Sequence, residues 1–126
     1  MQGLLFIAFL ALIAIIAFKL ISRKLALRGH EITSADMVAL YPNKPYIIDV
    51  RTAEEYNEYH IPGSKLIPLR ELGRRSKEVP IDRDVYIICQ SGNRSAEGTV
   101  WLLKKGYDRV YNISGGMNKW KGPVEK

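Results

Sequence analysis

The chain has 126 residues, of which 47% are hydrophobic, and it carries 19 Lys and Arg against 13 Asp and Glu, for a formal net charge of +6. Its single cysteine cannot form an internal disulfide, and one cysteine with two histidines cannot complete a zinc site built from Cys and His ligands. A disulfide scaffold and a zinc finger are therefore excluded, and the length allows one globular domain of modest size.

Most of the excess positive charge lies near the N-terminus. Residues 1–18 contain no charged side chain, and residues 29–126 contain 15 basic and 13 acidic residues, a net charge of +2. The segment between them, residues 19–28, contains no acidic residue and four basic ones: Lys19, Arg23, Lys24 and Arg28. A basic nucleic-acid surface is not supported, and we expect no nucleic-acid partner.

The apolar run from Gly3 to Ile21 predicts a transmembrane helix. As a helix it would be roughly 28 Å long, close to the hydrocarbon thickness of a bilayer, and Lys19 could extend its ammonium group to the interface. A cleaved signal peptide is the alternative, but its positive charges would precede the run and a small-residue site would follow it. A buried core helix is a weaker alternative, because the rest of the chain could hardly cover it on every side.

We therefore divide the chain into a transmembrane anchor at 1–22, a basic juxtamembrane linker at 23–28 and a domain at 29–126. Lys and Arg beside a span stay on the cytoplasmic side of the membrane. We expect a single-pass protein of the cell inner membrane, with its N-terminus outside and its C-terminal domain in the cytoplasm. The lipid bilayer is then one partner, and a reducing compartment suits the free thiol.

From Gly29 onward, short apolar runs alternate with amphipathic segments, which predicts an α/β domain with a parallel sheet of four or five strands flanked by helices. The expected strands are Tyr46–Val50, Lys65–Leu69, Val85–Cys89 and Val110–Ile113. Helices are expected from Thr33 or Ser34 to about Tyr41, from a capping box at Thr52–Glu55 to about Tyr59, at Glu71–Lys77 and at Ser95–Lys105.

The loop after the strand at Val85–Cys89 is the strongest candidate site, because sites in open α/β sheets form beyond the carboxyl ends of strands. Its small polar residues could turn successive backbone N–H groups inward as an anion nest, reinforced by the N-terminus of the following helix. Arg94 could favour the thiolate of Cys89 and hold an anionic substrate. We expect Cys89 to be a partly exposed nucleophile; the alternative is a small buried hydrophobe that ends a strand.

This assigns Cys89 and Arg94 as catalytic residues. The substrate-binding residues are then those of the loop and the start of the helix: Gln90, Ser91, Gly92, Asn93 and Ser95.

Four motifs carry a resemblance to a known family: IIDVR at 47–51, EEYNEYHIPGS at 54–64, CQSGNRS at 89–95 and GGMNKW at 115–120. Together they make the chain from about Glu31 to Gly122 resemble the rhodanese-like sulfurtransferase domain. With the apolar segment in front, the whole looks like a bacterial membrane-tethered single-domain rhodanese.

The resemblance implies a rhodanese-like parallel sheet and a persulfide on Cys89. Sulfur would pass from a small anionic donor such as thiosulfate to a thiophilic acceptor such as a thiol or cyanide, with no metal and no organic cofactor. Two half-reactions predict ping-pong kinetics. Related phosphatases have five residues between Cys and Arg, whereas Cys89 and Arg94 are separated by four, which suits a persulfide better than a tetrahedral phosphate.

A second hypothesis is a membrane-tethered module that binds a partner protein, or relays persulfide to it, since one fold serves many functions. A membrane protein would be the natural client.

Other residues carry weaker predictions. Asp49 could line the site or order a turn. Arg51 could form an ion pair that orders the surroundings of the site, or it could be a solvated surface charge. We expect His60 to be structural, and Trp101 and Trp120 to be packing residues.

Overall fold

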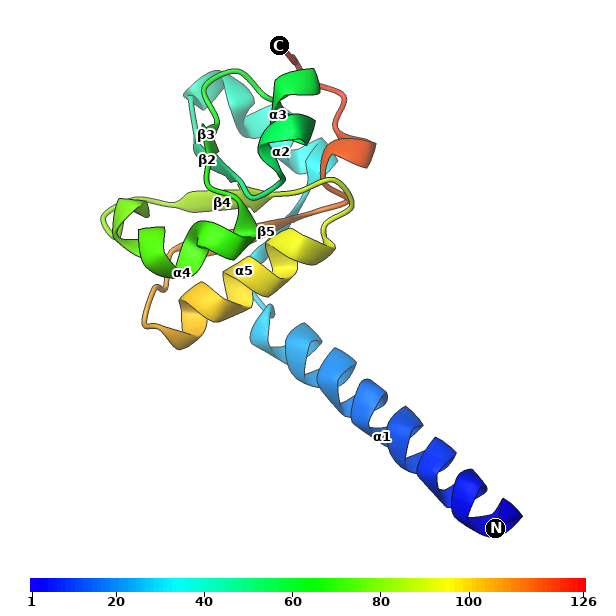
Figure 1. Ribbon diagram of the computed structural model, residues 1–126. Helices are drawn as coiled ribbons and strands as arrows, with labels where there is room; N and C mark the ends of the chain where they lie inside the picture. The colour runs from blue at the N-terminus through cyan, green and yellow to red at the C-terminus, as the bar shows by residue number, and fades with distance from the viewer.

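The computed structural model describes residues 1–126 as one long helix followed by a sheet with helices on both faces (Figure 1). The helix α1 (Gln2–Ala26) leads into the domain. The strands are β1 (Glu31–Thr33), β2 (Tyr46–Asp49), β3 (Lys65–Leu66), β4 (Val85–Ile88) and β5 (Val110–Ser114). The helices of the domain are α2 (Ser34–Leu40), α3 (Ala53–Glu58), α4 (Leu72–Arg75) and α5 (Asn93–Lys104), with 3-10 turns at η1 (Tyr41–Asn43), η2 (Leu69–Glu71), η3 (Ser76–Glu78) and η4 (Met117–Lys119).

All neighbouring strands are parallel, in the order β1-β5-β4-β2-β3. This confirms the predicted fold class and settles the strand number at five. The fifth strand is β1, which the sequence prediction missed. It pairs only with β5 and has just three residues, so it lacks the apolar run that marks a buried strand.

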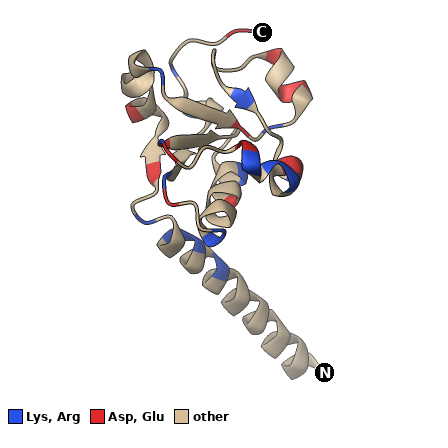
Figure 2. Cartoon of the chain, turned by 90° about the vertical axis from the view of Figure 1, so that its left-hand side faces the viewer, with Lys and Arg blue, Asp and Glu red and all other residues tan.

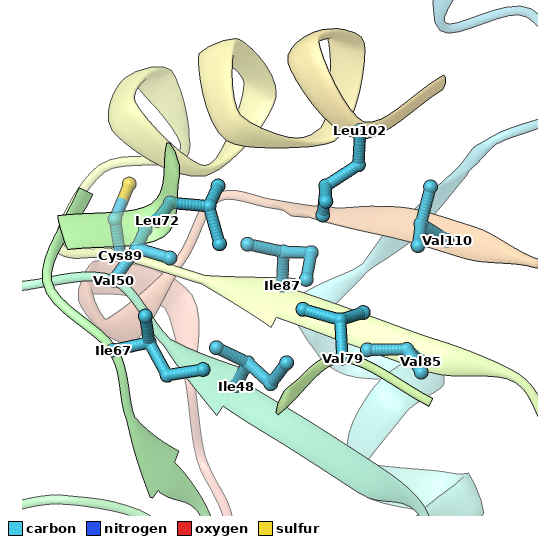
Figure 3. Packing of buried hydrophobic residues seen from close by; sticks show 10 residues of the cluster. All are labelled: Ile48, Val50, Ile67, Leu72, Val79, Val85, Ile87, Cys89, Leu102 and Val110. Atoms are coloured by element: carbon cyan, nitrogen blue, oxygen red, sulfur yellow. The ribbon is translucent and has the colours of Figure 1, made fainter. Parts of the chain in front are cut away.

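Successive side chains of β2 and β4 point to opposite faces of the sheet and form two separate cores. One cluster includes Ile48, Ile87 and Leu102, and it lies between the sheet and the helices α4 and α5 (Figure 3). The second cluster, with Ile47, Ile88 and residues of α2 and η4, covers the other face. The strand β4 is therefore buried on both sides, and its carboxyl end is held firmly between β2 and β5.

Two of the predicted helices differ from the structure. The helix expected over residues 71–77 is broken into η2, α4 and η3, because glycine at 73 and charged neighbours favour helix only weakly. The helix expected at 95–105 begins at Asn93, so Asn93 and Arg94 belong to its first turn and not to the loop. The capping box at Thr52 and Glu55 is confirmed, since each residue accepts a hydrogen bond from the backbone of the other.

The helix α1 is long and apolar enough to cross a membrane, and none of its residues is buried; a signal sequence near an N-terminus would share these properties. The predicted linker at 23–28 is not a separate segment, because α1 continues to Ala26 and Leu27 is 4% exposed against the domain. Basic residues gather where α1 meets the domain, and the preceding turns of α1 carry none (Figure 2).

Candidate active site

Cys89 directly follows β4, as predicted, and its thiol lies beneath the start of α5 (Figure 3). Its Sγ accepts a hydrogen bond from the backbone N–H of Gly92 at 3.0 Å and lies 3.2 Å from the hydroxyl of Ser95. The residue is fully buried, at 0% exposure. The expectation of a partly exposed thiol is therefore wrong, because the loop and the first turn of α5 cover the sulfur, each with one polar partner on it.

The loop around the thiol is rich in unused backbone donors. The backbone N–H groups of five residues donate to no protein acceptor: Gln90, Ser91, Asn93, Arg94 and Ser95. The last three belong to the first turn of α5, where helical N–H groups have no partner within the helix and carry partial positive charge. Unpaired donors at a helix N-terminus favour an anion, and the anion nest stays a prediction that these donors support.

A second chain segment fixes the backbone of this loop from behind. The N–H groups of Met117 and Asn118 in η4 donate to the carbonyls of Cys89 and Gln90, each at 2.9 Å. Gly116 makes this approach possible: its φ is +53°, and a Cβ there would lie 2.4 Å from the Cys89 carbonyl oxygen. Both carbonyls are therefore engaged by η4, while the neighbouring backbone N–H groups of the loop are not.

Asp49 and Arg51 form a buried ion pair beside the loop, with side chains 0% and 1% exposed. Arg51 donates to both Asp49 oxygens, at 3.0 and 2.9 Å, and the Arg51 backbone N–H donates to Asp49 Oδ1 at 3.0 Å. The remaining guanidinium hydrogens reach the Tyr59 carbonyl at 2.8 Å and Gln90 Oε1 at 3.2 Å. The interpretation of Arg51 as a solvated surface charge is wrong, and Asp49 orders the turn and also pairs with Arg51.

Arg94 does not point freely into the site. Its guanidinium donates to both carboxylate oxygens of Glu55 in α3, at 2.7 and 2.9 Å. These hydrogen bonds lower the pKa of Glu55 to about 2 and raise that of Arg94. Cys89 also makes a smaller electrostatic contribution to the raised pKa of Arg94. Glu55 is therefore a residue of the site that the sequence identified only as a helix cap.

The other predicted binding residues divide into two groups. Gln90 is held at the side of the site by its neighbours. Its side-chain amide donates to Asn118 Oδ1 at 2.8 Å and to the Tyr59 hydroxyl at 3.3 Å. Asn93 is exposed, and its side chain accepts a hydrogen bond from Arg23 of α1 at 3.2 Å. Ser91 is exposed at the tip of the loop. Tyr59 and Asn118 were not predicted, because their proximity depends on chain segments far from Cys89 in sequence.

The three residues expected to be structural, His60, Trp101 and Trp120, pack against other parts of the domain. The His60 ring stacks on Tyr56 with 3.8 Å between ring centroids, and its Nδ1 lies 2.8 Å from the Tyr56 carbonyl. Trp120 is 8% exposed and its indole N–H donates to the Pro123 carbonyl. Trp101 is half-buried beside α4. None of the three lies among the contacts of Cys89.

Comparison with known proteins decides the family. The family model for the rhodanese-like domain matches residues 33–123, which is most of the chain. The chain belongs to the rhodanese-like domain family. The resemblance seen in the sequence motifs is thereby confirmed, and this is a family of sulfurtransferases and sulfur carriers.

Curated relatives of this rhodanese-like chain include proteins named for sulfur chemistry. The putative sulfur carrier protein YrkF of Bacillus subtilis is 43% identical over 79 residues, which cover 63% of this chain and 43% of that protein. YqhL of the same organism is 39% identical over 82 residues, covering 65% of each. A sulfurtransferase of Allochromatium vinosum is 39% identical over 74 residues, covering 59% of this chain and 69% of that protein.

Solved structures confirm the rhodanese fold. A rhodanese-like domain protein from Staphylococcus aureus matches with a TM-score of 0.71 at 31% identity, covering 76% of this chain and 96% of that one. A rhodanese from E. coli, solved with anions, matches with a TM-score of 0.58 at 32% identity, covering 65% of this chain and 98% of that one.

Proposed function

We propose that this protein is a membrane-anchored sulfurtransferase that carries sulfane sulfur on Cys89. The observation that carries the proposal is the thiol held by the Gly92 N–H and the Ser95 hydroxyl, beside backbone donors that have no protein acceptor. A dianion such as thiosulfate fits this environment. The E. coli rhodanese solved with anions is a relative consistent with an anionic ligand.

The first half-reaction loads the cysteine. The Cys89 thiolate attacks the outer sulfur of thiosulfate, a new S–S bond forms at Cys89, and the S–S bond of the donor breaks. Sulfite leaves with the electron pair of that bond. The unpaired amides at the start of α5 would stabilise the negative charge on the terminal persulfide sulfur.

The second half-reaction returns the cysteine to its thiolate. A nucleophile such as cyanide or a thiolate attacks the outer persulfide sulfur and takes it, as thiocyanate or a new persulfide, while the bonding pair returns to Cys89. The Asp49–Arg51 pair orders the wall next to Gln90, and Glu55 positions Arg94 near the mouth. These residues position groups around the thiol without touching the reacting sulfur.

The test uses the full chain in detergent with thiosulfate and cyanide, beside the Cys89→Ser variant. We expect the parent to produce thiocyanate and to gain the mass of one sulfur atom after thiosulfate alone, and the variant to do neither. A parent that forms neither persulfide nor thiocyanate would overturn sulfur transfer.

A second candidate is a persulfide relay for a partner protein, favoured by the similarity to the putative sulfur carrier YrkF. The same assay separates it from a catalyst. A relay would accept one sulfur from the donor but produce thiocyanate at a rate close to that of Cys89→Ser. A membrane protein client would then be the acceptor.

For the location, α1 supports an inner-membrane anchor with the domain in the cytoplasm, because the cations follow the apolar run. Protease added to inverted membrane vesicles should digest the domain, whereas protease added to intact spheroplasts should not. The reverse pattern would overturn this orientation.

A further inference from the structure

The anchor helix is joined firmly to the domain. Leu27, just after α1, is 4% exposed, and the Arg23 guanidinium of α1 donates to the Asn93 side chain at the start of α5. A cavity of about 550 Å³ lies between the two helices, lined by residues from Phe18 to Ala26 of α1 and from Glu97 to Lys104 of α5. The direction of α1 therefore determines how the domain sits relative to a membrane.

This junction brings α5 close to the bilayer if α1 spans it, as proposed above. Arg23 lies five residues after Phe18, the last residue of the uncharged run, which is about 7.5 Å along the helix axis. The polar headgroup layer on each side of a bilayer is roughly 5–8 Å thick. Trp101 and Lys104 share the cavity with Phe18 and Lys19, so the second half of α5 lies at headgroup height.

The side chains of α5 in this position are those that membrane interfaces favour. Trp101 is half-buried, and the Lys105 ammonium lies 5.3 Å from its ring centroid. Lys104 and Lys105 are exposed and take part in no ion pair of the chain. Tryptophan and Lys concentrate at membrane surfaces, and each cation near an anionic surface contributes about 1 kcal/mol.

We propose that the α5 surface formed by Trp101, Lys104 and Lys105 rests on anionic lipid headgroups beside α1. This contact rests on the membrane anchoring of the proposed function. It adds a second attachment point to the span, which holds the Cys89 loop at the membrane surface next to Asn93 and Arg23. Sulfur would then pass to an acceptor presented at the bilayer surface.

The experiment places the full chain in nanodiscs that contain a phospholipid with a headgroup spin label, which quenches nearby tryptophan fluorescence. Nanodiscs of phosphatidylcholine alone are compared with nanodiscs that also contain phosphatidylglycerol. We expect severalfold stronger quenching with the anionic lipid. Trp101→Phe should abolish the quenching, and the remaining fluorescence of Trp120, which belongs to the core on the other face of the sheet, should be unaffected.

Charge reversal supplies the matched control. The double variant Lys104→Glu, Lys105→Glu should reduce quenching to the level of neutral nanodiscs while thiosulfate turnover in detergent stays unchanged. The control double variant Lys121→Glu, Lys126→Glu makes an equal change in net charge near the C-terminus, which lies far from α1 (Figure 1). It should leave the quenching of Trp101 unchanged. Equal quenching in neutral and anionic nanodiscs, or an equal effect of both double variants, would overturn the α5 contact.

Alkaline carbonate extraction of membranes tests separately whether α1 anchors the chain. Extraction of the chain would overturn the anchor and the α5 contact together. Retention of the chain in the membrane without quenching of Trp101 would overturn only the α5 contact.

Discussion

Arg94 at the start of α5 and Glu55 at the start of α3 form an ion pair with two hydrogen bonds, with N–O distances of 2.7 and 2.9 Å. The pair joins two helix N-termini, where a carboxylate is electrostatically favoured and a cation is not. Glu55 therefore offsets the charge of Arg94 and keeps its guanidinium in place. The consequence is that the site is less positive than its sequence suggests.

Removing the Glu55 charge should strengthen the binding of a dianionic donor. For Glu55→Gln we expect the KM for thiosulfate to fall about 2- to 5-fold, consistent with up to about 1 kcal/mol for a partly exposed pair, and to depend more steeply on ionic strength. Glu54→Gln, on the same helix but exposed, removes the same charge and should leave KM unchanged. A rise in KM would contradict this expectation and show that the loss of Arg94 positioning outweighs the removal of the Glu55 charge.

The low pKa of Glu55 predicts a specific acid response. The pKa falls from 4.5 to about 2 on folding, because Arg94 and Thr52 bond to the charged carboxylate. Ionised Glu55 therefore stabilises the fold above about pH 4.5, and this contribution is lost as the pH falls to about 2. Thermal unfolding followed by circular dichroism should find Glu55→Gln less stable than the parent at neutral pH, with the difference vanishing in acid. A difference that persists at pH 2 would contradict this origin.

The buried Asp49–Arg51 pair predicts a large stability effect. Arg51→Ala leaves the Asp49 carboxylate buried without its partner, which should cost about 3–5 kcal/mol and lower Tm substantially. Arg83→Ala breaks an exposed pair with Asp82 and should cost less than about 1 kcal/mol. Similar losses in the two variants would show that burial of Asp49 is not decisive.

A side chain at position 116 should impair persulfide formation, because Gly116 lies against the backbone of the cysteine loop. In Gly116→Ala the new Cβ would meet the carbonyls of Cys89 and Gln90 at 2.4 and 2.7 Å, so the loop must move. We expect persulfide formation, measured by intact mass after thiosulfate, to fall at least about tenfold, which corresponds to about 1.4 kcal/mol. Gly106 also has a positive φ, +100°, but open space around it, so Gly106→Ala should keep full activity.

Loss of the Ser95 hydroxyl should slow persulfide formation at Cys89 directly. Its hydroxyl lies 3.2 Å from Cys89 Sγ, and a hydrogen bond to a charged group is worth about 1.5–3 kcal/mol. Ser95→Ala should therefore slow single-turnover persulfide formation by about 10- to 100-fold. Ser91→Ala, at the exposed loop tip, should have little effect. Equal slowing in both would mean that loop structure, and not the Ser95 hydroxyl, controls the rate.

Local patterns in the sequence predicted much of this molecule. The buried strands before Val50 and Cys89, the Thr52 cap and the cysteine loop all depend on residues close together along the chain. The family motifs then indicated the fold. The Arg94–Glu55 pair could not be foreseen in this way, because its members lie 39 positions apart in the sequence and two helices must fold before they meet.

Burial was the other property that the sequence did not reveal. For Arg51 the sequence left open an ion pair and a solvated surface charge; in the structure Asp49 and the Tyr59 carbonyl together satisfy it inside the protein. Cys89 was expected to be accessible, but the cover above it depends on the precise course of the loop. The docking of α1 through Leu27 likewise depends on a surface formed only after the domain has folded.

The complete burial of Cys89 has a kinetic consequence. A covered thiol can react only when the loop above it opens, and such an opening should admit a small anionic sulfur donor and an oxidant alike. Loading with sulfur and damage by peroxide should therefore depend on the same opening. A substitution that loosens the loop should therefore raise both the rate of sulfur loading and the rate of thiol oxidation.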